Sequence, residues 1–310
     1  MLDSAWYSLQ CSASLVTAQT QSAAPDQPAL AEIGAADLVF VALAMLAVVV
    51  MWRRGVLSSS AFATAPQRRG SLGLYDPLWA LGGLLVIGGL AAAVAIAAFG
   101  QASEAERLLA AMLGAQLGAL VIVPAILIRA AVACEGGLRG FGLRFDRPLP
   151  TLGAAVLAAL VLIVLTIATI GLAVMISMLL GYERPDPIAH PTLQALLETR
   201  DVAVRAVLII SAAVVAPITE ELIFRGMVQT AILQSGLLGG RWRAILITSA
   251  LFTVMHLSLA WQTLPGLFVL SVGLGYVYER TGRIWAPILI HAIFNSFQLG
   301  LLLSGVVQPN

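Results

Sequence analysis

Long apolar stretches separated by short polar loops run through most of the chain. A helix that crosses a bilayer needs about 20 mainly apolar residues. Because the bilayer offers no partners to backbone amide and carbonyl groups, such stretches must be helical, and none alternates as a barrel strand would. Eight stretches qualify: residues 36–52, 78–99, 108–128, 151–180, 203–223, 244–260, 262–278 and 286–304.

The arginines support this division. Of the 17 basic residues, all of them arginine, thirteen lie in alternate loops, near residues 53–69, 129–147, 225–243 and 280–283, and three lie in the loops between. Arginine-rich loops face the cytoplasm, so the distribution predicts eight spans with both termini on the non-cytoplasmic side. The absence of lysine is typical of a GC-rich bacterial genome and predicts a bacterial cytoplasmic membrane.

Composition places the protein in the membrane class. Sixty per cent of the residues are hydrophobic, only 11% are charged, and the mean hydropathy is +0.95, whereas soluble domains carry roughly 25% charge. These values exclude a water-soluble enzyme and a nucleic-acid binder, and they predict an all-α, polytopic transmembrane bundle in contact with membrane lipids. Cys11 and Cys134 are too far apart to suggest a disulfide framework or a thiolate metal site.

The chain divides into four parts. Residues 1–35, rich in Ser, Ala, Gln and Thr, are expected to form a flexible tail, and no cleavable signal peptide is recognisable in them. Residues 36–139 hold the first three helices, residues 140–304 hold the other five, and residues 305–310 form a C-terminal tail.

Charged and polar residues interrupt the apolar pattern in the last third of the chain. Each charge within a span costs about 2.5–3.5 kcal/mol on insertion scales, so it marks a candidate functional position. Three segments hold these residues: PITEELIFRG (217–226), FTVMH (252–256) and HAIFN (291–295). We therefore expect a functional cluster on the last four helices.

Two adjacent glutamates in the first segment have different prospects for pairing. Glu221 and Arg225 are four residues apart with the acid N-terminal to the base, the better orientation for a helical ion pair. Glu220 points about 100° away and has no such local partner. An unpaired carboxylate in lipid tends to act as a proton acceptor or a ligand. Pro217 removes a backbone hydrogen bond just before the pair and allows a kink.

The depths of the candidates can be compared along the helices. Glu220 and His256 each lie 14 residues from the ends of the loop near 235–242, which places both about 21 Å from it. His291 lies six residues past Trp285, only about 9 Å deep. We expect the cluster within the membrane toward the cytoplasmic side, on tilted or overhanging helices.

Each residue also has a purely structural interpretation. The Glu221–Arg225 pair can serve packing alone, and a single His or Asn in a membrane often only joins helices. One unpaired glutamate, two histidines and Asn295 on three helices together favour a functional site. Three known classes of intramembrane protease are not supported by the sequence. The zinc motif HExxH and the serine motif GxSG are absent, and Tyr276 stands where an aspartyl protease requires its second Asp. Asp76 is instead expected to cap a helix.

The three segments resemble the motifs of the CAAX protease and bacteriocin-processing (CPBP) family of intramembrane proteases, which includes the eukaryotic type II CAAX prenyl endopeptidase. EExxxR matches Glu220 to Arg225, FxxxH matches Phe252 to His256, and HxxxN matches His291 to Asn295. Their order, spacing and hydrophobic setting all agree with the family. The resemblance covers roughly residues 140–304.

This resemblance implies an intramembrane endopeptidase. Carried over by position, Glu220 and His256 activate a water molecule. His291 and Asn295 stabilise the oxyanion of the tetrahedral intermediate. The supporting residues are Glu221, Arg225 and Phe252.

A catalytic metal is a separate expectation. Glu220, His256 and His291 supply the oxygen and nitrogen ligands that zinc accepts, with water in the fourth position. The family is often described as metalloproteases on that basis. A metal-free glutamate mechanism uses the same residues, and we slightly favour it.

The expected substrate is a membrane-associated protein or peptide. A prenylated CAAX protein is the eukaryotic substrate, but the composition indicates a bacterium, where prenylated proteins are not expected. Two alternatives stay open. A non-proteolytic member of the family could act as an immunity or scaffold protein. An ion-coupled transporter could use the same charges, although such folds often show paired repeats and here the polar residues lie in one half.

Overall fold

The computed structural model of this chain describes residues 35–99, 104–182 except 145 and 147, 201–236 and 239–305, with single positions between 185 and 199. Within these ranges the protein is helical, and its only β-type pairing is an isolated bridge between Gly70 and Cys134. The expected all-α fold is confirmed. The tails expected at 1–35 and 305–310 lie almost entirely outside the described residues.

Each of the eight apolar stretches forms a helix. The central one, residues 202–235, is continuous and is divided into α8 (Val202–Ile210), η3 (Ser211–Val215), α9 (Ala216–Glu221), η4 (Leu222–Gln229) and α10 (Thr230–Ser235). We call it the central helix. The others are α2 (Ala35–Arg53), α3 (Tyr75–Phe99), α4 (Glu104–Ala133), α6 (Pro148–Leu179), α11 (Arg241–Val254), α12 (Leu264–Thr281) and α13 (Trp285–Leu303). Short helical turns are η2 (Ser59–Phe62), α5 (Leu138–Phe141) and η5 (Trp261–Thr263).

Not every helix has the length and composition of a full span. Five helices are long and apolar enough to cross a membrane: α3, α4, α6, the central helix and α13. The apolar part of α2 is shorter, and α11 and α12 do not meet these conditions. The eight predicted helices are therefore present, and five of them qualify as spans by themselves.

The helix expected over residues 244–260 is shorter than predicted. α11 ends at Val254, and its last turn tightens as the amides of His256 and Leu257 donate to the carbonyls three residues earlier. Residues 255–259 are as apolar as the helix before them, so the pattern could not reveal this end. The 14 residues of α11 span about 21 Å, less than the roughly 30 Å hydrocarbon core.

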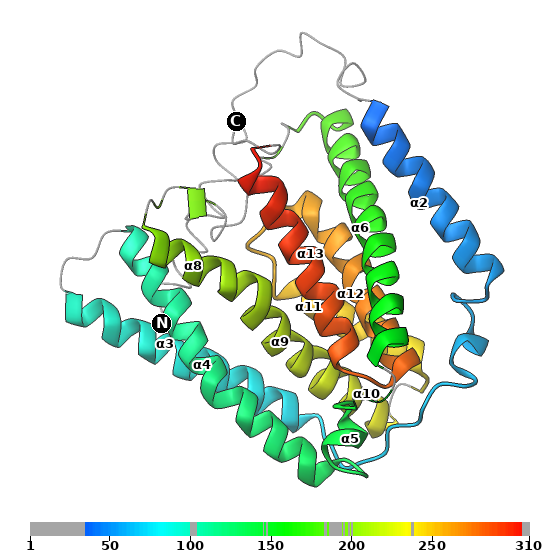
Figure 1. The fold of residues 1–310 in the computed structure, drawn as a ribbon, viewed down its shortest axis with the longest axis horizontal. Helices are drawn as coiled ribbons and strands as arrows, with labels where there is room; N and C mark the ends of the chain where they lie inside the picture. Colours follow the sequence, from blue (N-terminus) through cyan, green and yellow to red (C-terminus); the bar gives the residue numbers. More distant parts are fainter. Residues whose placement is uncertain are drawn as a thin grey trace.

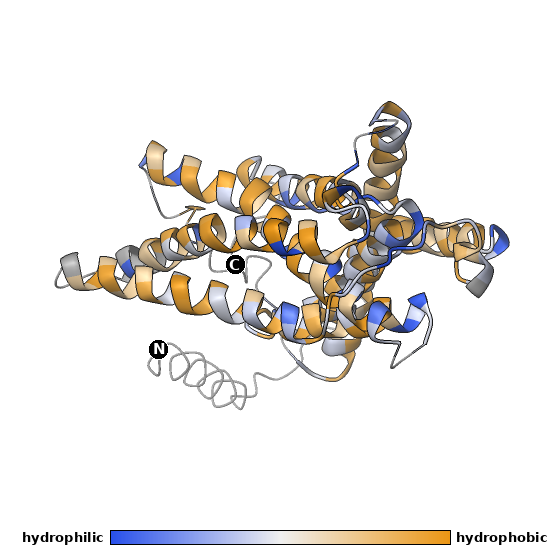
Figure 2. Cartoon of the chain, turned by 90° about the horizontal axis from the view of Figure 1, so that it is seen from below, coloured by the Kyte–Doolittle hydropathy of each residue, from blue (hydrophilic) through white to orange (hydrophobic). Residues whose placement is uncertain are grey.

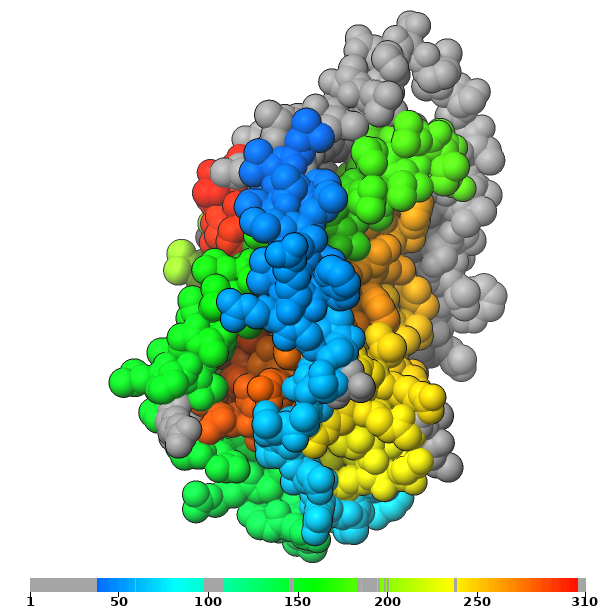
Figure 3. All heavy atoms as spheres, turned by 90° about the vertical axis from the view of Figure 1, so that its right-hand side faces the viewer, coloured from blue at the N-terminus to red at the C-terminus, as the bar shows by residue number. Residues whose placement is uncertain are grey.

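The helices form two groups on either side of the central helix (Figure 1). α3 and α4 pair as a hairpin that packs against η3 and η4. On the other side α13 packs on η3 and α9, α11 packs on η4, and α12 and α13 pack on α6. α2 lies outermost against α6, as Figure 3 shows from that side.

Glycines bring the α3–α4 hairpin close together. A Cβ atom added to Gly114 would lie 2.3 Å from the carbonyl oxygen of Gly88, and one added to Gly118 would lie 3.0 Å from the carbonyl oxygen of Leu84. Small residues at such contacts let transmembrane helices approach closely. The two helices can therefore lie this close together because glycine has no side chain at these contacts.

Residues 54–74, which we call the strap, cross the arginine-rich end of the molecule. Arg241 donates to the carbonyl of Pro66 (2.7 Å), Arg280 donates to the Thr64 hydroxyl (2.7 Å), and the amide of Leu72 donates to the Gln234 side chain (3.0 Å). Hydrogen bonds thus join loops that were predicted to share one side of the membrane. Figure 2 shows most helices apolar along their length, with hydrophilic positions gathered mainly toward one end.

Candidate active site

The central helix places both glutamates on a short regular segment between two wide turns. η3 and η4 are π-helical and flank α9, which ends with Glu220 and Glu221. η3 comes just before Pro217, whose missing amide hydrogen interrupts the regular hydrogen-bond ladder. Wide turns inside α-helices are frequent at functional sites. The local opening anticipated at Pro217 is thus present as a π-helical turn.

Glu221 is fully buried and is held by two partners. Its Oε1 atom accepts a hydrogen bond from Nη1 of Arg225 at 2.8 Å, and the side chains of both residues are wholly inaccessible. The same oxygen lies 2.9 Å from Nδ1 of His291 on α13. The expected Glu221–Arg225 ion pair is present, and it also anchors a histidine from another helix.

Arg225 reaches further, to α12 and α11. Its Nη2 atom donates to the Ser271 hydroxyl (2.6 Å) and to the Ser271 carbonyl (3.0 Å). Its guanidinium lies 5.0 Å from the centre of the Phe252 ring, within cation–π range. Sequence analysis missed Ser271, because a lone serine in an apolar helix carries no signal of its own.

The contact with Glu221 fixes the tautomer of His291. A carboxylate paired with a guanidinium can only accept hydrogen bonds, so Nδ1 of His291 carries the hydrogen. In a neutral ring Nε2 then keeps its lone pair, and this atom lies 3.9 Å from Oε2 of Glu220. His291 therefore lies between the two glutamates, bonded to one and facing the other.

Glu220 differs from its neighbour in burial and in pairing. Its side chain is 28% exposed, whereas that of Glu221 is wholly buried. Among the described residues, His291 lies 3.9 Å from Glu220, and the charge of Arg225 also acts on Glu220, with no hydrogen bond between the two. The sequence prediction of one paired and one largely unpaired glutamate matches this arrangement.

His256 lies in the turn after α11, against the ring of Phe252. Its Nδ1 atom lies 2.8 Å from the carbonyl oxygen of Phe252, and since a carbonyl only accepts, Nδ1 carries the hydrogen. Nε2 is then free to accept a proton. The Phe252 ring lies 4.5 Å from the His256 ring and 6.1 Å from the His291 ring, so Phe252 packs between the two histidines.

Asn295 lies one turn beyond His291 on α13 and is half-buried. Its Nδ2 atom donates to the carbonyl of Ala212 in η3 at 2.8 Å. An amide nitrogen has two hydrogens, so this contact leaves one for another acceptor. Asn295 therefore ties α13 to a wide turn of the central helix.

The depth mismatch expected from the sequence has a simple structural cause. The Phe141 ring packs where a Cβ of Gly226 would lie, and the adjacent Gly142 carbonyl accepts from the amide of Ile284, just before α13. The start of α13 is therefore level with residue 226, not with the end of the central helix. Glu220 lies six residues before Gly226, and His291 lies six residues after Trp285. The two side chains are therefore about equally far from this level.

The three residues considered as zinc ligands are not gathered around one point. In the part of the chain that the structure describes, no group of three His, Cys, Asp or Glu side chains is placed to hold a metal ion. Nδ1 of each histidine is hydrogen-bonded, which leaves Nε2 as the ring nitrogen that could bind a metal. The side chains as they lie here do not fit a three-ligand zinc site, so no step below is routed through one, and zinc stays a prediction that chelation tests.

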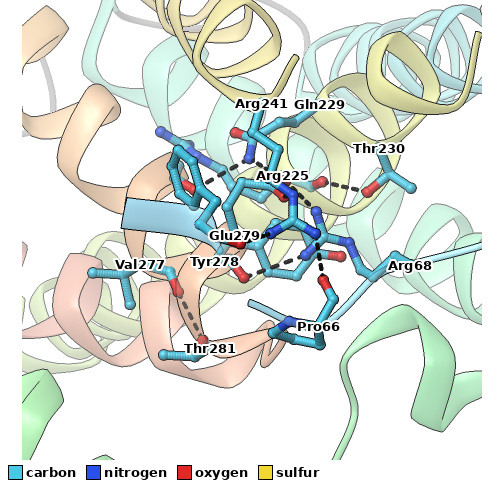
Figure 4. A network of polar contacts seen from close by, with 12 residues as sticks. Pro66, Arg68, Arg225, Gln229, Thr230, Arg241, Val277, Tyr278, Glu279 and Thr281 are labelled. Carbon is cyan, nitrogen blue, oxygen red and sulfur yellow. Dashed lines mark hydrogen bonds and ion pairs between the residues drawn. The ribbon is translucent and has the colours of Figure 1, made fainter. Parts of the chain in front are cut away.

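A second buried polar network lies beside the site, toward the arginine-rich end (Figure 4). Glu279 on α12 is wholly buried and pairs with Arg68 of the strap and with Arg241 of α11. Its Oε1 also accepts from Gln229 (2.9 Å), one turn after Arg225. This network could not be predicted from the sequence, because Glu279 stands near a helix end, where a solvated charge is ordinary.

Comparison with known proteins locates the similarity in the part of the chain that carries this site. Residues 202–297 match the family model of the type II CAAX prenyl endopeptidase, described as Rce1-like. The "Putative membrane peptidase YdiL" of Bacillus subtilis is 33% identical over 90 residues, which is 29% of this chain and 35% of that protein. The match thus spans about a third of the relative's length. No solved structure matches the chain significantly. Residues 202–297, which contain all three motifs, are therefore similar to the Rce1-like type II CAAX prenyl endopeptidases.

Proposed function

We propose that this protein is a membrane-embedded endopeptidase that hydrolyses a peptide bond in a membrane-associated protein or peptide. The observation that carries the proposal is the difference in burial and pairing between the two adjacent glutamates. Glu221 is buried and bound by Arg225 and His291, while Glu220 is partly exposed and faces Nε2 of His291. A structural role would favour burying and pairing both carboxylates.

Glu220 is the proposed general base, with His256 as its partner. The carboxylate takes a proton from a water molecule as the water oxygen attacks the scissile carbonyl carbon. Nε2 of His256 accepts the second hydrogen bond of that water and orients it. The hydrogen bond from Nδ1 to the Phe252 carbonyl keeps the required tautomer.

His291 and Asn295 are the proposed stabilisers of the oxyanion. To donate, His291 needs a proton on Nε2, and Glu220 at 3.9 Å can pass on the one taken from water. The second Nδ2 hydrogen of Asn295 supplies the other donor. Donors directed at developing negative charge are worth about 10²–10³ in rate each. When the C–N bond breaks, the carbonyl re-forms and the stored proton passes to the leaving amine.

Four residues hold this arrangement without touching the reacting atoms. Arg225 fixes Glu221, Ser271 fixes Arg225, and Glu221 orients His291. Phe252 packs against both histidine rings. They are positioning residues, because each acts through another side chain.

Cleavage of a library of membrane-associated peptides by the full-length protein in detergent tests this proposal. We expect Glu220→Gln and His256→Ala to lower the rate by about 10²–10⁴. Glu135→Gln, an exposed glutamate at the arginine-rich end, is the matched control and should cleave like wild type. Wild-type cleavage by Glu220→Gln would overturn the assignment of the base.

A zinc chelator in parallel reactions separates the two chemistries. Cleavage that survives chelation supports the metal-free glutamate mechanism. Cleavage lost on chelation and restored by zinc would make Glu220, His256 and His291 ligands and would require these side chains to rearrange. Absence of cleavage by the wild type, together with ion flux in liposomes, would favour a transporter instead.

A further inference from the structure

A cavity of about 360 Å³ opens at the arginine-rich end, away from the glutamates and histidines. Its walls come from the start of the strap, directly after α2, and from the last turns of α12, and its polar lining residues are Arg54, Ser60, Tyr276 and Arg280. Figure 3 looks onto the face where α2 continues into the strap. Helices α11 and α13, which carry residues of the second and third motifs, contribute none of its lining residues.

The charge of this cavity is positive and uncompensated. Of the residues that the structure describes, two with guanidinium groups and two with hydroxyl groups line it, and none with a carboxylate does. The neighbouring acid on α12, Glu279, is buried and bound by Arg68 and Arg241. Arg280 donates to the Thr64 hydroxyl and also interacts with the Tyr276 hydroxyl. A guanidinium has five N–H donors, so some of them remain for a ligand. Paired guanidinium groups match phosphate in charge and geometry.

Aromatic residues indicate that the cavity lies at the membrane surface. Trp52, two residues before Arg54, is 70% exposed at the end of the apolar helix α2. Tyr276, which lines the cavity, packs on Phe62 and Trp242 with ring centroids 5.5 and 5.8 Å away. Amphipathic aromatic rings gather at the level of the lipid headgroups. By the positive-inside rule this end faces the cytoplasm.

We propose that this cavity binds the phosphate group of an anionic phospholipid of the cytoplasmic leaflet. Arg54 at the start of the strap and Arg280 on α12 hold the phosphate oxygens, and the hydroxyls of Ser60 and Tyr276 complete the shell. Basic pockets between transmembrane helices on the cytoplasmic side are suited to such headgroups. A lipid bound there joins α2 to the core through the strap. The proposal does not depend on proteolysis.

Native mass spectrometry of the full-length protein tests it. The protein is taken from vesicles of phosphatidylcholine with a minor fraction of phosphatidylglycerol, and the lipid retained per protein is measured. We expect wild type to retain phosphatidylglycerol selectively, and Arg54→Gln to lower its affinity at least about tenfold, as for the loss of a hydrogen bond to a charged group. Arg54→Gln/Arg280→Gln should lose at least about 100-fold.

Control variants distinguish a specific lipid-binding site from general electrostatic attraction between basic residues and anionic lipid. Arg53→Gln removes an equal charge one residue away, outside the cavity lining, and should change affinity less than twofold, as should Arg139→Gln. Equal losses in Arg53→Gln and Arg54→Gln would overturn the proposal, since they would indicate unspecific attraction. Retention of phosphatidylcholine and phosphatidylglycerol alike by wild type would also overturn it. Inorganic phosphate that binds with the same dependence on Arg54 while no lipid is retained would assign the cavity to a soluble anion.

Discussion

Nε2 of His291 lies 3.9 Å from Oε2 of Glu220, on the side of the ring opposite to the bond that Nδ1 makes with Glu221. One imidazole thus connects a buried, neutralised carboxylate with a partly exposed one. The first contact fixes the ring and its tautomer, and the second aligns a lone pair with the proposed base. Variants of Glu220 and of Glu221 should separate these two functions.

Replacing Glu220 should remove activity and leave stability nearly unchanged. Glu220→Gln preserves shape and removes the proton acceptor, so we expect a loss of about 10²–10⁴ in kcat. Because the side chain is 28% exposed, the thermal midpoint in detergent should stay close to that of wild type. A large fall in the midpoint would mean that Glu220 is chiefly structural.

Breaking the buried ion pair should instead reduce stability. Glu221→Gln leaves the Arg225 charge buried without its partner, at a cost of about 3–5 kcal/mol. The double variant Glu221→Gln/Arg225→Met removes both charges, so it should lose less than the sum of the single changes. Unfolding in detergent with increasing denaturant measures both effects.

The exposed pair Arg144–Asp146 provides the control for that experiment. Both side chains are about two-fifths exposed, so solvent screens them. Because Asp146 also pairs with the less exposed Arg283, the control change is Arg144→Gln, which should change stability little. Additive losses for Glu221 and Arg225 would contradict the coupling inferred from their 2.8 Å contact.

A methyl group at Gly114 should push α3 and α4 apart. In Gly114→Ala the added Cβ would meet the Gly88 carbonyl oxygen at 2.3 Å, a backbone atom that cannot move aside alone. We expect a loss of about 1–3 kcal/mol, as for other overpacked contacts. Gly82→Ala, on α3 with nothing within 4 Å of its Cβ, should be neutral or slightly stabilising. Equal effects of the two would refute the close approach of the hairpin.

The rate at which Cys134 is alkylated should show whether the strap is packed against the end of α4. Its neighbourhood is closed by the strap, since Gly70 pairs with it and the amide of Ser71 donates to the carbonyl of Ala133 (2.9 Å). In a Cys11→Ser background, alkylation of native Cys134 should be slow at neutral pH. Glu279→Gln, which weakens the anchor of Arg68, should accelerate it.

The pH dependence of that alkylation has a defined sign. Burial raises the pKa of the Cys134 thiol, and the thiolate is the species that reacts. The rate in the native protein should therefore rise only above the ordinary thiol range near pH 8.5. A midpoint at or below that value would show that Cys134 is exposed. Arg144→Gln, an exposed change at the same end, should leave the profile unaltered.

The sequence by itself was sufficient for the helices and for the motif residues. Lipid forces apolar stretches into helices, and a four-residue spacing puts Glu221 beside Arg225 on any helix. These are local effects, so they can be read from one segment at a time. The end of α11 at Val254 escaped prediction because the apolar pattern continues into the turn that holds His256.

Only the tertiary structure decided which side chains from different helices meet. The contacts of Arg225 with Ser271, of Glu279 with Arg68 and of Arg54 with the α12 cavity join residues far apart in sequence. No periodicity encodes them, because they depend on how α13 and α12 pack across the central helix and on the level at which α13 begins. The pairing of residues within a helix follows from its geometry, whereas the pairing between helices follows from their packing.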